Sequence, residues 1–101
     1  MDHVLLFLAG VSLINALPHL VKGLCGEPFP TPFARPRGVG DSPPLTNFLW
    51  GFVNLALGIG LTLNRLPHVD RDVGLALLAA GGLTIGVYLA LHFGKVRGAR
   101  H

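Results

Sequence analysis

Three long apolar runs alternate with shorter polar stretches along the chain. Residues 4–21, 45–64 and 73–93 contain no Asp, Glu, Lys or Arg. Each run is close to the roughly 20 apolar residues that a helix needs to cross the hydrocarbon of a bilayer. A helix that packs against the core of a soluble protein keeps a polar face toward water, and these runs barely have one. The pattern therefore predicts an all-α integral membrane protein with three transmembrane helices.

The composition agrees with this interpretation. Hydrophobic residues make up 50% of the chain and charged residues 13%, whereas a soluble domain carries roughly 25% charged residues. A chain of 101 residues has room for one small core, which cannot hide so much apolar surface. We therefore expect a single membrane domain over residues 1–101, with the lipid bilayer as its solvent. The leader Met-Asp-His lacks the basic residues of a signal peptide, so we expect a retained first helix.

Basic residues cluster in the first loop, 22–44, and in the basic tail, 94–101. They are Lys22, Arg35, Arg37, Lys95, Arg97 and Arg100, against Arg65 and Arg71 in the second loop. By the positive-inside rule the first loop and the C-terminus are cytoplasmic and the N-terminus lies outside. We expect a bacterial-type inner membrane. No basic stripe is interleaved with aromatic residues, so we expect no nucleic-acid partner.

Small and polar residues recur at helical spacing in the second run. Asn47, Gly51, Asn54 and Gly58 follow at steps of 4, 3 and 4, so they share one helix face. Small residues let helices approach closely, and Asn amides can hydrogen-bond between helices. This face predicts the packing seam of the bundle. Its asparagines either join helices or line a path for a substrate or proton.

The other two runs carry matching faces. These are Ser12, Asn15 and His19 in the first run and Gly81, Tyr88 and His92 in the third. In the topology above, His19, Asn47, Tyr88 and His92 all lie in the cytoplasmic half. We therefore predict a polar pocket there, roofed by the first loop. Alternatively, Tyr88 and Trp50 belong to an interfacial aromatic belt.

The first loop is rich in proline: Pro28, Pro30, Pro32, Pro36, Pro43 and Pro44 lie in it. Proline at every second position excludes a helix or central strand and favours a stiff, extended path. We predict an ordered lid on the membrane, formed by Pro28, Phe29, Pro30, Pro32 and Phe33. It covers a ligand, a partner or the bundle itself. Ser42 or Thr46 is expected to cap the second helix, with Pro43 and Pro44 at its first turn.

No catalytic motif is present: the chain has no Walker A, HExxH or Gly-x-Ser-x-Gly sequence. Cys25 is the only cysteine, which excludes an internal disulfide. We expect no resident cofactor and no metal, with His19 and His92 as the candidate ligands if one is bound. In the second loop, Asp70 and Asp72 are expected to serve as a solvated turn and a helix cap.

Much small-residue surface and little chemistry indicate an accessory or assembly subunit, or a self-associating helical bundle without catalysis of its own. We expect a homo-oligomer or a larger membrane complex as its setting. One alternative is a small oligomeric transporter or channel with a polar path through Asn15, His19 and Asn54. Another is a haem- or quinone-associated redox membrane subunit near His19 and His92. A proton pump is disfavoured, because no run contains an acidic residue.

Overall fold

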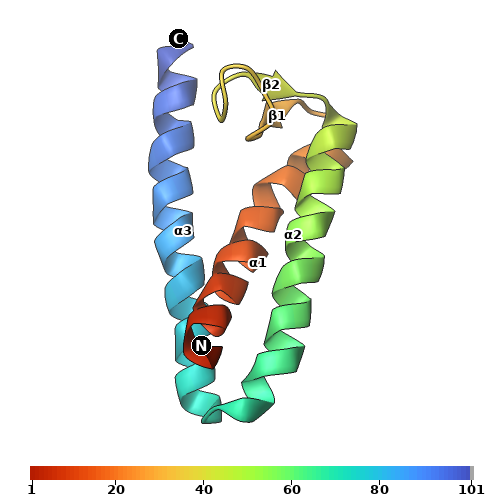
Figure 1. Ribbon diagram of the computed structural model, residues 1–101. Coiled ribbons are helices and arrows are strands. Elements are labelled where there is room, and N and C mark those ends of the chain that lie inside the picture. The colour runs from red at the N-terminus through yellow and green to blue at the C-terminus, as the bar shows by residue number, and fades with distance from the viewer. Residues whose placement is uncertain (101) are drawn as a thin grey trace.

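The computed structural model describes residues 1–100 and consists of three long helices, a short hairpin and a tight turn (Figure 1). The elements are α1 (Asp2–Leu24), β1 (Phe29–Pro30), β2 (Asp41–Ser42), α2 (Pro44–Arg65), the 3-10 turn η1 (Leu66–His68) and α3 (Arg71–Ala99). His101, the last residue of the expected tail, lies outside the described residues. All three long helices are apolar and long enough to cross a membrane. The predicted all-helical architecture is thus confirmed.

The helices run further than the apolar runs that predicted them. The third was expected over 73–93, but α3 extends from Arg71 to Ala99 and includes most of the expected tail. A helix needs only its backbone hydrogen bonds to continue, and Lys and Arg are good helix formers near a C-terminus. The loss of hydrophobicity after Phe93 therefore does not end the helix.

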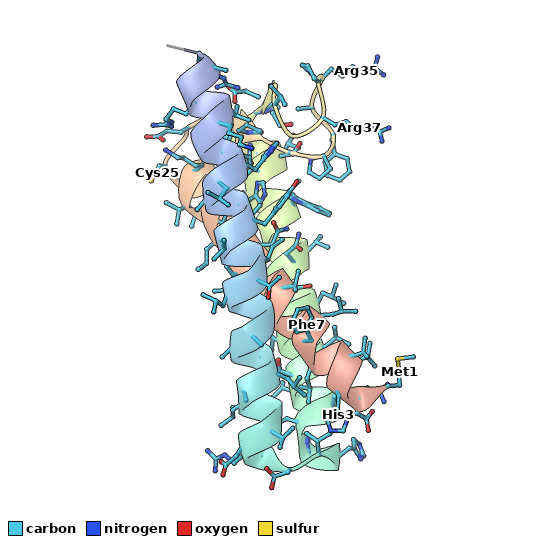
Figure 2. All side chains as sticks on the ribbon, turned by 90° about the vertical axis from the view of Figure 1, so that its left-hand side faces the viewer. Met1, His3, Phe7, Cys25, Arg35 and Arg37 are labelled. Carbon is cyan, nitrogen blue, oxygen red and sulfur yellow. The ribbon has the colours of Figure 1, made fainter. Side chains whose placement is uncertain are left out.

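Helix α1 packs against both of the other helices and lies between them (Figure 1). The bundle is elongated, with extents of 46 × 24 × 20 Å. The hairpin and the C-terminal end of α3 share one end of the molecule, while the N-terminus and the α2–α3 turn share the other (Figure 1). In Figure 2, Arg35 and Arg37 mark the first end, and Met1 and His3 mark the second. We call these the hairpin end and the turn end.

Glycines set the distance between the helices. A Cβ built on Gly81 would overlap the backbone oxygen of Phe7, and one on Gly10 would overlap that of Leu78, so α1 and α3 touch backbone to backbone. On the other side of α1, a Cβ on Gly51 would lie 2.8 Å from the backbone nitrogen of Leu20. Small residues thus permit close helix approach at both interfaces.

Of the two helix caps predicted from the sequence, one is present in the structure and the other is not. Asp70 caps α3 as predicted, its carboxylate accepting a hydrogen bond from the Val73 amide at 3.1 Å. The predicted cap of α2 by Ser42 or Thr46 is wrong, because no side chain caps that helix. Ser42 lies in β2, where its hydroxyl is 2.6 Å from that of Thr31. Pro44 opens α2 as expected.

The proline-rich loop folds back on itself. Strands β1 and β2 pair antiparallel, with Phe29 opposite Ser42 and Pro30 opposite Asp41. A two-stranded ribbon has only edge strands, where proline is tolerated because its missing N–H can face away from the partner. This hairpin positions the loop over the upper part of the bundle in Figure 1.

Candidate functional site

A cavity of about 210 Å³ lies beneath the hairpin, bounded by all three long helices. Its lining residues are Asn15, His19, Pro30, Thr31, Pro32, Gly38, Trp50, Ile85, Tyr88, Leu89, His92 and Phe93. The cavity thus gathers a part of the predicted pocket face, Asn15, His19, Tyr88 and His92, with two prolines of the predicted lid. None of the lining residues is Asp, Glu, Lys or Arg. The site is therefore uncharged, with a few polar groups set in a largely apolar lining.

The rest of the predicted face lies in the helix contacts around this cavity. Asn47, Gly51, Asn54 and Gly58 are the buried residues of α2. Ser12 is buried in α1, and Gly81 is buried in α3. The lid residue Pro28 lies toward the C-terminal end of α3, in a small depression shared with Phe93 and Arg100. The predicted residues Ser12, Asn47, Gly51, Asn54, Gly58, Gly81 and Pro28 thus lie around the cavity without lining it.

Asn47 is the centre of the polar network that holds the hairpin. Its side chain is fully buried, and its Nδ2 group donates to three backbone carbonyls: those of Phe29 at 2.9 Å, Ser42 at 3.1 Å and Pro43 at 3.2 Å. Its Oδ1 atom lies 2.8 Å from Nδ1 of His19. A single amide thereby joins both strands of the hairpin to α1 and to the start of α2.

This network determines which nitrogen of His19 carries hydrogen. A carbonyl only accepts, so the amide N–H₂ of Asn47 must face the three backbone oxygens, and its Oδ1 must face His19. Nδ1 of His19 is therefore the donor. In the neutral ring Nε2 is then an acceptor, and the only side-chain hydrogen bond of His19 within residues 1–100 is the one through Nδ1. The ring is 2% exposed and lines the cavity.

A second amide pair joins α1 to α2 deeper in the bundle. Asn54 donates through Nδ2 to the Trp50 carbonyl at 2.9 Å, and its Oδ1 accepts from Nδ2 of Asn15 at 3.2 Å. This leaves Oδ1 of Asn15 as a further free acceptor beside the cavity. The arrangement is what interhelical packing requires, because each amide in an apolar surrounding needs a partner.

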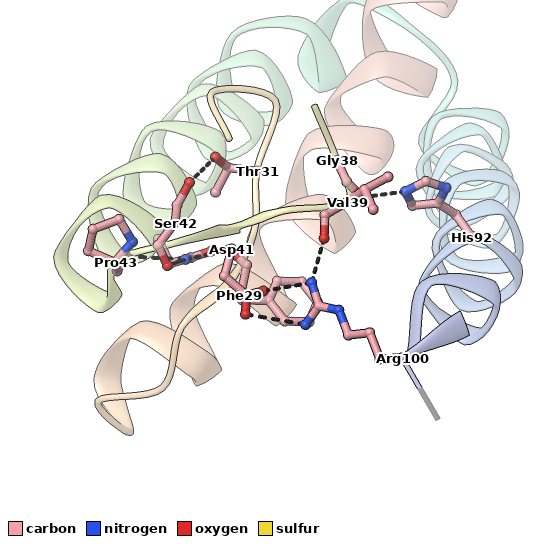
Figure 3. A network of polar contacts seen from close by, with 10 residues as sticks. Phe29, Thr31, Gly38, Val39, Asp41, Ser42, Pro43, His92 and Arg100 are labelled. Carbon is pink, nitrogen blue, oxygen red and sulfur yellow. Dashed lines mark hydrogen bonds and ion pairs between the residues drawn. The ribbon is translucent and has the colours of Figure 1, made fainter. Parts of the chain in front are cut away.

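The hairpin also binds α3, as Figure 3 shows. Nε2 of His92 donates to the carbonyl of Gly38 at 2.7 Å. Gly38 has a φ of +67°, a left-handed conformation that favours glycine. Arg100 adds hydrogen bonds to the Val39 carbonyl and to the Asp41 carboxylate. Helix α3 is thus tied to the loop by side chains from its last turns.

Aromatic side chains close the space between the hairpin and the helices. Phe29 packs against Phe93, with ring centroids 4.6 Å apart, and edge-on against His19 at 5.6 Å. Phe33 meets the Trp50 ring at 5.0 Å and 88°. The indole N–H of Trp50 is buried without a polar partner. Phe29 thus fills the hairpin–helix contact, whereas Phe33 remains 63% exposed at its edge.

Tyr88 and His92 stand side by side on α3. Their rings are parallel within 3° and their centroids are 5.8 Å apart. Because His92 donates through Nε2 to a carbonyl, its Nδ1 is an acceptor in the neutral ring. Tyr88 lines the cavity and is 59% exposed, so part of its side chain also faces the outside of the bundle.

Sequence reasoning missed the contacts that fix the loop. Thr31 and Arg100 were not singled out, although Thr31 is 1% exposed and bonded to Ser42, and Arg100 reaches across to β2. Thr31 stands among alternating prolines, where no alternation of polar and apolar residues indicates which side chains are buried. No sequence signal therefore marks it. Arg100 could have been suspected only if the helix had been expected to continue past Phe93.

No group of three or more His, Cys, Asp or Glu side chains able to hold a metal occurs within residues 1–100. His19 and His92 both line the cavity, but each already uses one ring nitrogen in a hydrogen bond to the protein. The site as built thus offers hydrogen-bond acceptors and aromatic faces in place of a ligand set for a metal. Comparison with known proteins gave no match: no family model, curated protein or solved structure resembles the chain.

Proposed function

We propose that the chain is an integral protein of a bacterial-type inner membrane, with its hairpin end in the cytoplasm and its N-terminus outside. The charge distribution supports this orientation. The hairpin end carries Lys22, Arg35, Arg37, Lys95, Arg97 and Arg100, whereas the turn end carries Arg65 and Arg71. Basic residues are retained on the cytoplasmic side of helical membrane proteins.

Within that membrane, the protein acts as an accessory or assembly subunit or as a self-associating bundle, without catalytic chemistry of its own. One observation carries this proposal: an open, almost wholly apolar groove of about 670 Å³ runs along α1 and α3. Its lining includes the small residues Gly10, Ala79, Gly82, Gly86 and Ala90. Lipid-exposed helices associate where small residues let a second helix approach closely.

Helix α3 has surface to spare for such a partner. Its buried residues are Gly74, Gly81, Gly82 and Val96, so most of its length faces outward. In water, hydrophobic side chains drive helices together. In lipid they do not, because the lipid tails are as apolar as the side chains. Shape therefore decides where a partner helix lies, and the groove is the concave, small-residue part of this surface.

Two glycine variants test the proposal with a matched control. A Cβ on Gly86 would lie 3.7 Å from Ile14, which is ordinary contact, and Gly86 lines the groove, so we expect Gly86→Leu to fill the groove without separating α1 from α3. Gly60 has no heavy atom within 4 Å of a built Cβ, so Gly60→Leu adds the same side chain elsewhere. We expect native mass spectrometry of gently extracted protein to show a larger particle, lost in Gly86→Leu and kept in Gly60→Leu.

A wild-type particle with the mass of one chain would contradict the proposal, as would a particle that survives Gly86→Leu. The transporter and haem alternatives have less support. A polar path through the bundle has less support because Asn15 and Asn54 bond to each other. Gly10 and Gly81 pack backbone to backbone against neighbouring helices, so α1 and α3 are in direct contact there. A haem is also too large for the cavity beneath the hairpin. Its volume of about 210 Å³ is smaller than the roughly 300–1,000 Å³ typical of sites for drug-sized ligands.

A further inference from the structure

We propose that the cavity beneath the hairpin binds the ring of a lipid-soluble hydroquinone, in preference to its oxidised quinone. The proposal rests on membrane insertion as proposed above, but not on partner binding in the α1–α3 groove. It follows from the cavity's size, its lack of charge, the direction of its hydrogen bonds and its aromatic lining.

Size and charge restrict the ligand first. The cavity volume of about 210 Å³ lies below the roughly 300–1,000 Å³ usual for drug-sized ligands, so it suits a single ring. Its lining contains no charged side chain, and burying an unpaired charge is costly. Phosphate head groups and metal ions therefore fit it poorly. A neutral ring avoids the cost of burying a charge.

The hydrogen-bond directions then restrict the polar groups of the ligand. Nε2 of His19 is an acceptor because Nδ1 donates to Asn47, and the neutral His92 offers Nδ1 because Nε2 donates to Gly38. Oδ1 of Asn15 is a third free acceptor, because its Nδ2 donates to Asn54. These three acceptors outnumber the donors of the lining, which are the unpartnered indole N–H of Trp50 and the Tyr88 hydroxyl, so the site favours a ligand that donates hydrogen bonds.

A hydroquinone can use both the acceptors and the donors of this lining, whereas its quinone can use only the donors. The two hydroxyl groups of the hydroquinone can donate to acceptors such as Nε2 of His19, whereas the two quinone oxygens only accept. Aromatic side chains in the lining, Trp50, Tyr88 and Phe93, offer flat contacts for the ring. A site built to bond a ligand hydroxyl discriminates strongly against an analogue that lacks it.

The opening of the cavity suits a ligand that arrives from lipid. Tyr88, which is 59% exposed, belongs both to the lining and to the outer surface, and the lining residues Trp50 and Tyr88 come from α2 and α3. Both helices are apolar and long enough to span a membrane. The tail of a lipid-soluble hydroquinone can therefore stay outside the bundle while its ring enters beside Tyr88.

The test uses the full chain in nanodiscs and a radiolabelled alkyl hydroquinone kept under reducing conditions. Binding is the saturable excess of probe in loaded over empty nanodiscs. We expect the unlabelled hydroquinone to displace the probe at least about 10-fold better than its dimethyl ether does. The radiolabelled quinone, assayed separately without reductant, should bind at least about 10-fold more weakly than the hydroquinone. One lost hydrogen bond of about 1.4 kcal/mol corresponds to this factor of ten.

Two α3 variants test the place of binding. Ile85→Phe enlarges a lining side chain, and we expect it to reduce probe binding about 10-fold or more. Leu91→Phe, at a 64% exposed position outside the lining, is the matched control and should bind as the wild type does. Gly86→Leu, which tests partner binding, also leaves the lining unchanged and should retain the probe.

Equal displacement by the hydroquinone and its ether, or equal affinity for the labelled quinone and the labelled hydroquinone, would overturn the proposal. So would full binding by Ile85→Phe, or equal displacement by a long-chain aliphatic alcohol, which lacks the ring. Loss of the oligomer in Gly86→Leu with unchanged probe binding would separate the two proposals. A chain that fails to enter nanodiscs would instead count against membrane insertion itself.

Discussion

The two ends of the bundle are held together in different ways. Toward the turn end, α1 and α3 touch through Gly10 and Gly81, with backbone against backbone. Toward the hairpin end, α3 separates from α1 and α2, and the hairpin fills the gap (Figure 1). There the contacts are polar, through Asn47, His92 and Arg100. Close packing toward the turn end brings the helix backbones into contact, whereas the splayed end contains the cavity beneath the hairpin.

The comparison shows what small residues and polar residues each contribute in an apolar bundle. Glycine allows van der Waals contact over the backbone but gives no directional bond. Buried amides give direction, because each unpaired donor or acceptor costs about 1–3 kcal/mol. The turn end therefore depends mainly on side-chain volume, with one ion pair between Arg65 and Asp2 at 3.1 Å, and the hairpin end depends on hydrogen-bond partners.

The largest expected effect is at the tight end of the molecule. Gly81→Leu places a side chain where even a Cβ would overlap the Phe7 backbone oxygen, so α1 and α3 must move apart. We expect the free energy of unfolding to fall by about 3 kcal/mol, the upper end for overpacked sites. The measurement is reversible unfolding in mixed micelles. Gly94→Leu, with open space around its Cβ, is the control; similar losses in both variants would contradict the glycine contact.

A smaller and more local effect is expected at the hairpin end. Asn47→Leu removes the donors to three backbone carbonyls and the acceptor for His19, so the hairpin should detach while the helices persist. The loss should be about 1–3 kcal/mol, as for unsatisfied buried groups. Trypsin should then cleave faster after Arg37, at the bond between Arg37 and Gly38. Asn64→Leu, at an exposed position of α2, should keep the wild-type rate; faster cleavage there too would refute a specific role for Asn47.

The smallest effect concerns the exposed ion pair between α1 and the loop. The ammonium of Lys22 lies 2.7 Å from the Glu27 carboxylate and lowers the pKa of Glu27, by a hydrogen bond and by charge attraction. A lowered pKa in the folded state means that this contact stabilises the protein above the ordinary pKa of 4.5 and is lost as the pH falls through the folded value. Lys22→Gln should raise the pKa of Glu27 in an NMR titration. Lys95→Gln should not, and an unchanged pKa in Lys22→Gln would exclude the pair in solution.

These predictions show where sequence reasoning was sufficient. The apolar runs gave three helices because a stretch that is apolar all round can satisfy its backbone only by helical bonds in lipid or in a buried core. The steps of 4, 3 and 4 from Asn47 to Gly58 put four residues on one face, and that face is the buried side of α2. Helical period and hydrophobicity are local properties, so sequence alone carries them.

The ends of elements were less well determined. Helix α3 runs past Phe93 to Ala99 because a change from apolar to basic residues marks a boundary of environment and does not break a helix. The predicted Ser42 cap failed for a related reason. Its hydroxyl has a partner in Thr31, which only the folded loop brings near.

What the sequence determined by itself is therefore the number of helices, their apolar character, the shared faces and the charge difference between the two ends. Only the tertiary structure decided that Asn47 joins the hairpin to α1, that His19 keeps a free acceptor, and that Arg100 reaches Asp41. The physical reason is separation along the chain. Periodicity is set by neighbours within a few residues, whereas each of these bonds requires a distant segment to return to one place.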